Sequence, residues 1–190
     1  MDYKNKGFGA GGSKTNKNGL NFEDITDTYS FLANKKFQQK KEDKKEYFHR
    51  KDDKEIYWFT KNSKTLFKKF TKKEFNIESI RYPDESVIII EKDKINIFII
   101  EKKNQNVEGS VETKLWAAPT LKREFEYIFK NSERQIKIHY FLTMNDWLFK
   151  KFNSFEQKWI FLKEELKENN ILVFNGNDEN YFQDIFNHIV

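Results

Sequence analysis

The sequence predicts an α/β fold in which helices flank a mixed sheet. Residues 95–103 are the strongest evidence for the sheet. Most side chains on both faces of this run are apolar, as in a central strand covered on both sides. Residues 135–142 alternate between apolar and polar side chains, which predicts a further strand. Elsewhere apolar residues recur every three or four positions, which indicates amphipathic helices packed on a sheet.

The amino-terminal half is predicted to begin with an arm and to end with a hairpin. Residues 1–19, rich in glycine, asparagine and lysine, form the arm, and residues 20–190 form a single domain. Residues 35–55 are rich in charge, so we expect an irregular segment there. The elements predicted from apolar spacing are a helix at 21–34, a short strand at 56–59, a helix at 64–74, a short strand at 78–81, and a hairpin of strands 85–91 and 95–103.

The carboxyl-terminal half is predicted to alternate helices with two strands. Pro119 ends one helix and Thr120 caps the next. Ser154 and Gln157 have the spacing of a capping box at the start of a longer helix. The elements are helices at 111–118 and from 120 onward, a strand at 135–142, helices at 145–152 and 154–167, a strand at 171–174, and a helix at 179–188.

Composition narrows the classes of function. The chain carries 35 basic and 30 acidic side chains, and its net charge of +5 permits a nucleic-acid partner without requiring one. It has no cysteine, and His49, His139 and His188 lie far apart in sequence, which argues against disulfides and a zinc site. The amino terminus is polar and no apolar run has the length of a membrane span, so we expect a cytoplasmic protein without a membrane partner.

The predicted hairpin brings acidic and basic side chains to one point. Asp84 begins its first strand, and Glu101 and Lys103 end its second, where their spacing puts them on the same face. Asp84 and Glu101, 17 positions apart in sequence (101 − 84), then lie side by side. Charges at the end of an apolar strand are costly unless they are paired or hold a metal. Taken alone, an E-x-K is usually a surface ion pair and a Pro-Asp a turn, but their joint placement favours a site for a hard divalent cation and an attacking water.

These residues also carry a resemblance to a known family. Pro83-Asp84 and Glu101-x-Lys103 resemble the motif of the PD-(D/E)XK nuclease superfamily and, within it, of the type II restriction endonucleases. Gln105 extends the second part to E-x-K-x-Q, a variant seen in many restriction enzymes. The resemblance implies a restriction-endonuclease-like αβββαβ core.

A second segment strengthens the resemblance. Residues 11–23 look like the amino-terminal segment of some restriction endonucleases, in which a glycine- and asparagine-rich loop leads into the first helix. An early glutamate of that helix faces the active site, and Glu23 occupies the corresponding position here.

The resemblance implies a role for each residue of the site. Asp84, Glu101 and the main-chain carbonyl of Lys102 would bind Mg²⁺, an ion that prefers oxygen ligands. Lys103 would orient the attacking water or help to deprotonate it. Gln105 belongs to the same catalytic set. Glu23 would support a second metal, so the number of metals stays open between one and two.

The function implied is sequence-specific cleavage of double-stranded DNA by a homodimer, with Mg²⁺ as cofactor and a cognate DNA methyltransferase in the same system. Three alternatives stay open, namely a repair or structure-specific nuclease on the same core, a DNA-binding module without catalytic activity, and a purely structural α/β domain. Dependence of cleavage on base sequence would separate the leading hypothesis from the first alternative.

Two groups of residues are candidates for contacts to DNA. Lys64, Lys68 and Lys72 recur every four positions and so share one face of the predicted helix, either as phosphate contacts or as a solvated lysine face. The arm offers a second group, in which asparagines could reach base edges or phosphates, with a disordered tail as the alternative. This group consists of Lys14, Asn16, Lys17 and Asn18.

Overall fold

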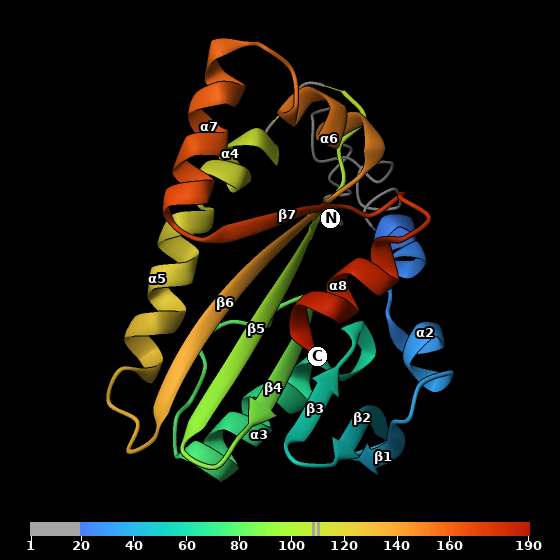
Figure 1. Cartoon of the computed structure of the whole chain (residues 1–190), viewed down its shortest axis with the longest axis vertical. Coiled ribbons are helices and arrows are strands. Elements are labelled where there is room, and N and C mark those ends of the chain that lie inside the picture. Colours follow the sequence, from blue (N-terminus) through green and yellow to red (C-terminus); the bar gives the residue numbers. More distant parts are fainter. Residues whose placement is uncertain (1–19, 108, 110) are drawn as a thin grey trace, which may run out of the picture.

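The computed structural model describes residues 20–107, 109 and 111–190. Its centre is a seven-stranded mixed sheet whose strands lie side by side in the order of the sequence (Figure 1). Strands β1 to β5 are antiparallel to their neighbours, and β5, β6 and β7 are parallel. The strands are β1 (Gln38–Glu42), β2 (Lys45–Lys51), β3 (Glu55–Phe59), β4 (Glu85–Ile90), β5 (Lys94–Lys103), β6 (Gln135–Met144) and β7 (Ile171–Asn175). The predicted mixed α/β fold is confirmed.

Helices cover both faces of this sheet. Side chains of α3 to α7 form one apolar core with one face, and side chains of α2 and α8 form a second core with the other. Among the described residues, no helix is both long enough and apolar enough to cross a membrane. The helical segments are residues 20–25, α2 (Tyr29–Ala33), η1 (Lys61–Ser63), α3 (Lys64–Phe75), α4 (Val111–Trp116), α5 (Ala118–Phe129), α6 (Asp146–Phe152), α7 (Gln157–Glu168) and α8 (Tyr181–Ile189).

Strand β5 is covered on both faces, as its sequence predicts. Ile95, Ile97 and Ile99 lie in the first core, whereas Phe98 and Ile100 lie in the second. All five side chains are buried, and burial of each contributes about 1.5–3 kcal/mol. The strand is therefore held from both sides, which fixes the position of the side chains at its carboxyl end.

The prediction of an irregular segment at residues 35–55 is wrong, because β1 and β2 form a hairpin there. Asp43 and Lys44, with φ values of 49° and 62°, make its two-residue turn. Asparagine or aspartate followed by glycine usually marks such a turn, and here lysine stands in place of the glycine. Phe48 of β2 is buried in the second core, whereas every side chain of β1 is exposed. Strand β1 is thus a polar edge, and its lysines hinder pairing with another sheet.

Two further elements differ from the prediction. Residues 78–81 form no strand, because β3 pairs directly with β4 and the chain between α3 and β4 is a loop. The helix predicted at residues 21–34 is interrupted at 26–28. Thr28, the N-cap residue of α2, makes no helical hydrogen bond through its main-chain N–H within the described residues. Instead its N–H and its hydroxyl both donate to the buried carboxylate of Glu85, at 3.1 and 2.7 Å.

Two predicted helix boundaries also differ. Pro119 lies in the first turn of α5 instead of ending a helix, a position where its missing N–H removes no helical hydrogen bond. Thr120 is therefore inside α5 and does not cap it. The cap of α7 is Glu156, and the Ser154 hydroxyl is buried without a hydrogen-bond partner in the described part of the chain.

Gly176, which follows β7, packs closely against Phe22, Thr26 and Thr143. A methyl group at this position would lie 2.7 Å from Phe22 Cζ and from Thr26 Cγ2, and 2.8 Å from Thr143 Cγ2. We expect Gly176→Ala to lower the free energy of unfolding by about 1–3 kcal/mol, because the packed neighbours must move. Urea unfolding measures this change.

Gly109→Ala is the matched control. Its new methyl group would meet Gln105 Nε2 at 3.6 Å, an ordinary van der Waals contact. We expect a change within about 1 kcal/mol, with a small gain from the stiffer unfolded chain. Equal losses of stability in the two variants would contradict the proposed contact at Gly176.

Candidate active site

Strands β4 and β5 bring the two predicted carboxylates together. Glu85 pairs with Ile100 across the hairpin, so Asp84, one position before β4, comes opposite Glu101. The main-chain N–H of Lys102 donates to Asp84 Oδ2 at 2.8 Å, which ties this carboxylate to the neighbouring strand. The predicted meeting of Asp84 and Glu101 at one end of the hairpin is therefore present.

Lys103 completes the cluster. Its Nζ donates to Glu101 Oε2 at 2.7 Å and lies 4.0 Å from Asp84 Oδ2. The Asp84 and Glu101 side chains are each 18% exposed and that of Lys103 is 14% exposed. The cluster thus holds two carboxylates and one ammonium group on one face of the sheet, with a limited opening to solvent.

The pKa values of the cluster follow from burial and from its charges. Burial raises the pKa of Glu101, and Lys103 opposes this rise while Asp84 adds to it. Burial acts to lower the pKa of Lys103, but the carboxylates of Glu101 and Asp84 outweigh it, so this pKa is raised. Lys103 is therefore a charged hydrogen-bond donor at neutral pH in this arrangement.

A second charged pair lies on the opposite face of β5. Lys102 Nζ donates to Glu85 Oε1 at 2.6 Å and to the main-chain oxygen of Thr26 at 2.9 Å, and both charged side chains are 0% exposed. Glu85 also accepts the two hydrogen bonds from Thr28 described above. The pair therefore fastens the segment after helical residues 20–25 to the opposite face of the β4–β5 hairpin.

The carboxylate oxygens of the cluster suit a hard cation that takes few ligands from the protein. Among the described residues, no group of three or more histidine, aspartate or glutamate side chains could hold a metal ion. Asp84 and Glu101 alone offer paired carboxylate oxygens at the cluster. Mg²⁺ is commonly held by one or two carboxylates together with waters and substrate phosphates, so this pair fits that ion.

Glu23 lies near the cluster without touching it. It belongs to helical residues 20–25 and is partly buried. Its main-chain oxygen lies 3.5 Å from Lys102 Nζ. Its charge also raises the pKa of Lys103, but less than the charges of Glu101 and Asp84 do. In the described part of the chain its carboxylate makes no hydrogen bond or ion pair.

Gln105 lies in the loop behind the cluster. Its main-chain N–H donates to Asn145 Oδ1 at 3.1 Å, and its Nε2 donates to the main-chain oxygen of Val107 at 2.5 Å. Its Oε1 is buried without a hydrogen-bond partner among the residues that the structure describes. These contacts hold the chain as it leaves β5.

The lysine row of α3 lies as its spacing predicts. Leu66 and Phe67 of α3 are buried in the first core, the core on the same sheet face as the cluster, whereas Lys72 is exposed. Lys64 and Lys68 are partly exposed, and Lys68 Nζ lies 4.1 Å from the centre of the ring of Tyr82, a residue just before the β4–β5 hairpin. Lys14, Asn16, Lys17 and Asn18 lie outside the described residues.

Arg81 is a cation beside the site that the sequence did not single out. Its Nε donates to both carboxylate oxygens of Glu124 on α5, at 2.9 and 2.8 Å. Its charge acts to lower the pKa of Glu101, against the larger effect of burial. Its position three residues before Asp84 is the signal that could have identified it.

Comparisons of the chain with known protein families, with curated proteins and with solved structures give no significant match. Any function must therefore be argued from the geometry of the cluster and its surroundings.

The buried Lys102–Glu85 pair predicts a non-additive pair of substitutions. Lys102→Met leaves the buried Glu85 carboxylate without its countercharge, so we expect the free energy of unfolding to fall by about 3–5 kcal/mol. Adding Glu85→Gln removes that charge and keeps an acceptor for Thr28, so the double variant should recover part of the loss. Urea unfolding of both single variants and the double variant measures the coupling.

Lys137→Met is the control, because this lysine is exposed on β6. We expect it to change stability by no more than about 0.5 kcal/mol. Additive losses for Lys102→Met and Glu85→Gln would contradict a coupled pair.

Proposed function

We propose that the chain is a Mg²⁺-dependent endonuclease that cuts double-stranded DNA at specific sequences. The observation that carries this proposal is the joint placement of Asp84, Glu101 and Lys103 on one face, with Lys103 Nζ 2.7 Å from Glu101 Oε2. The order of elements supports it, since helical residues 20–25 precede the antiparallel strands β3 to β5, which are followed by α4, α5 and the parallel strand β6. This order suits the proposed restriction-endonuclease-like αβββαβ core.

Asp84 and Glu101, with the Lys102 carbonyl as a third oxygen, would hold the metal. Bound there, Mg²⁺ would lower the pKa of a water molecule and offset the charge of the scissile phosphate. The Lys102 N–H fixes Asp84, and Lys103 fixes Glu101, so both carboxylates are held in place before substrate arrives. Such pre-arrangement reduces the entropy lost on binding.

Lys103 would orient the attacking water. Its raised pKa makes it a donor, so of the two roles that the resemblance allows, orientation fits this arrangement better than deprotonation. Its ammonium group would also attract the phosphate oxygens. Glu23, close enough to influence the pKa of Lys103, would support a second metal, and Gln105 would hold the loop behind the site.

The proposed substrate is duplex DNA. The lysine row of α3, formed by Lys64, Lys68 and Lys72, would contact phosphates beside the cluster, and the arm would add Lys14, Asn16, Lys17 and Asn18. A homodimer would match a palindromic site and place one cluster on each strand. In this proposal the enzyme works in the cytoplasm beside a cognate DNA methyltransferase that protects the host sequence.

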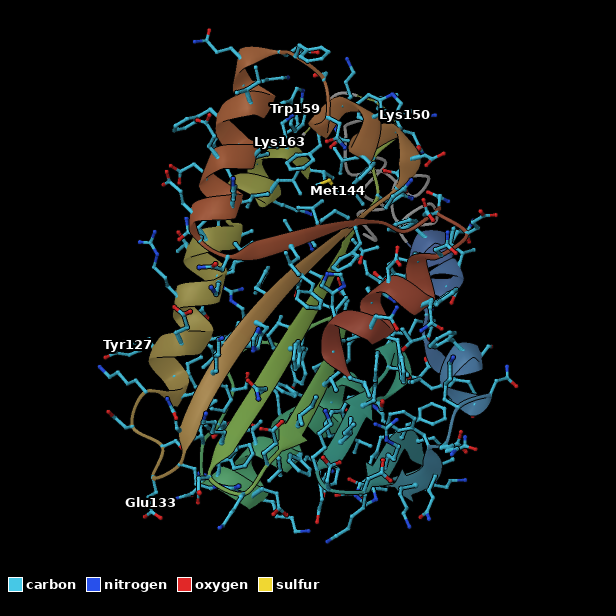
Figure 2. All side chains as sticks on the ribbon, in the orientation of Figure 1. Tyr127, Glu133, Met144, Lys150, Trp159 and Lys163 are labelled. Atoms are coloured by element: carbon cyan, nitrogen blue, oxygen red, sulfur yellow. The ribbon has the colours of Figure 1, made fainter. Side chains whose placement is uncertain are left out.

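Glu101→Ala tests the cluster directly. We expect metal-dependent cleavage of unmethylated phage-sized DNA to fall at least about 100-fold while DNA binding persists, because one of the two carboxylate ligands of the metal is lost. Glu133→Ala is the matched control, since this exposed glutamate lies in the loop before β6, at the opposite end of the sheet from the cluster (Figure 2). Cleavage is read on gels with Mg²⁺ and with EDTA.

The products discriminate among the functions. Discrete bands that require Mg²⁺ support a sequence-specific endonuclease, whereas a metal-dependent smear favours the repair or structure-specific nuclease. Intact DNA in every lane, together with a gel shift, favours a binding module. Equal cutting by Glu101→Ala and the wild-type protein would overturn the assignment of the cluster.

The lysine row predicts a change in the salt dependence of DNA binding. Lys64→Ala with Lys72→Ala removes two phosphate contacts from each subunit, so the slope of log affinity against log salt should fall by about 4 for the proposed homodimer. Lys68 is left in place because it packs on Tyr82. Lys92→Ala with Lys94→Ala is the control pair, as these exposed lysines lie at the other end of the β4–β5 hairpin. An unchanged slope in the α3 variant would mean a solvated lysine face.

A further inference from the structure

A cleft of about 540 Å³ lies beyond the carboxyl ends of β5, β6 and β7. Five asparagines, from four separate segments of the chain, supply half of its lining. Figure 2 marks this end of the molecule with Met144, the last residue of β6, and with Lys150 on α6. The lining residues are Asn21, Phe22, Ile25, Asn104, Asn106, Asn145, Asp146, Trp147, Lys150 and Asn177. We call this the asparagine cleft.

The asparagine cleft begins where the candidate active site ends. Asn104 directly follows Lys103 in the chain, which places their Cα atoms about 3.8 Å apart. The main-chain N–H of Asn145 donates to the main-chain oxygen of Lys103 at 3.2 Å. The carboxyl ends of parallel strands are also the edge at which open α/β sheets bind ligands. The cleft therefore adjoins the end of β5 that carries the cluster.

The chemistry of the cleft suits the edge of a base better than a phosphate. Its two charged side chains, Asp146 and Lys150, have opposite signs and lie 4.0 Å apart. The asparagines are neutral, and each side chain presents a donor and an acceptor side by side. Phosphate sites use cations or main-chain N–H groups, whereas a base edge in the major groove presents donors and acceptors together.

The internal hydrogen bonds of the cleft show which groups are left for a ligand. Asn145 uses its oxygen and its amide nitrogen on Gln105 and Asn106. Asp146 Oδ1 accepts a hydrogen bond from Asn175 at 2.7 Å, so this carboxylate is already occupied and is poorly placed to accept from a cytosine amino group. By contrast, the exposed side-chain amide of Asn21 makes no hydrogen bond within the described part of the chain.

Asn21 has an apolar neighbour that suits the same ligand. Ile25 lies four positions later in helical residues 20–25, so the two side chains share one face, with Cβ atoms about 6 Å apart. Ile25 is 56% exposed although it is a large apolar residue, and it lines the cleft. The side-chain amide of an asparagine can form two hydrogen bonds with adenine, one with the N6 amino group and one with N7 of the base. An apolar side chain can contact the methyl group of thymine.

We propose that the asparagine cleft reads the major-groove edge of an adenine·thymine pair near the scissile phosphate. Asn21 is the specificity-determining residue for the adenine, and Ile25 contacts the methyl group of the paired thymine. This inference rests on the proposed function, because it assigns a base-reading site to the proposed nuclease. It predicts that the recognition sequence contains at least one adenine·thymine pair.

The test combines a protein variant with a modified DNA. A randomised duplex library is cut by the wild-type protein with Mg²⁺, and the ends are sequenced to give the recognition site. The preference for adenine at one position should fall about tenfold in Asn21→Ala. Replacing that adenine by 7-deazaadenine, which lacks the N7 acceptor, should slow the wild-type protein by a similar factor and Asn21→Ala no further. Asn131→Ala, at an exposed asparagine before β6, is the control.

The outcomes separate this inference from the proposed function. If the wild-type protein cuts no DNA, the proposed function and the cleft assignment both fail. If it cuts a defined site, and either the site lacks adenine·thymine pairs or Asn21→Ala keeps the wild-type preference, the nuclease stands and the cleft assignment is wrong. If Asn21→Ala stops cutting, library DNA bound to the variant is sequenced, and a retained adenine preference overturns the assignment.

Discussion

The buried ion pair of Lys102 and Glu85 is the constraint on which the rest of this structure depends. Two charges at 0% exposure are tolerated because they pair with each other and because further hydrogen bonds are made to both side chains. Glu85 accepts from Lys102 and twice from Thr28, and Lys102 also donates to the Thr26 carbonyl. Satisfying this pair breaks the first helix at residues 26–28 and holds the broken end against β5.

The two faces of the β4–β5 hairpin carry different arrangements of charge. On one face, Lys102 and Glu85 are sealed from water and fully paired. On the other, Asp84, Glu101 and Lys103 keep a small opening, and their charges sum to −1. Burial raises the pKa of Glu101, which means that the charged form of this carboxylate is disfavoured as the cluster stands. An additional cation beside the carboxylates would favour their charged forms. A rigid back and an acidic, partly open front are what a metal site at the end of a strand needs.

The sequence predicted the hairpin and its cluster because both depend on local pattern. Period-two alternation fixes which side of β5 carries Glu101 and Lys103, and the tight turn at residues 91–94 fixes the register that brings Asp84 opposite Glu101. Neither rule needs knowledge of distant parts of the chain. The apolar character of both faces likewise identified β5 as a covered strand without reference to its neighbours.

What the sequence could not predict depends on tertiary contact. Strands β1 and β2 were missed because their turn uses lysine at a positive φ and because β1 has no buried side chain. The helix break at Thr28 depends on Glu85, which lies 57 positions away. The sequence predicted a role for Lys102 only through its main-chain carbonyl, since no local pattern reveals that its ammonium group is buried against a distant helix.

Helical residues 20–25 connect the two sites of this molecule. The segment that follows them is fastened to Lys102, the residue between Glu101 and Lys103. Glu23 lies toward the cluster, close enough to affect the pKa of Lys103, whereas Asn21 and Ile25 line the asparagine cleft. A ligand that orders this helix from the cleft would therefore also fix the carboxylate of Glu23 beside the cluster. In a sequence-specific nuclease, such a link would let a matched base pair improve the geometry of catalysis and not only the affinity for DNA.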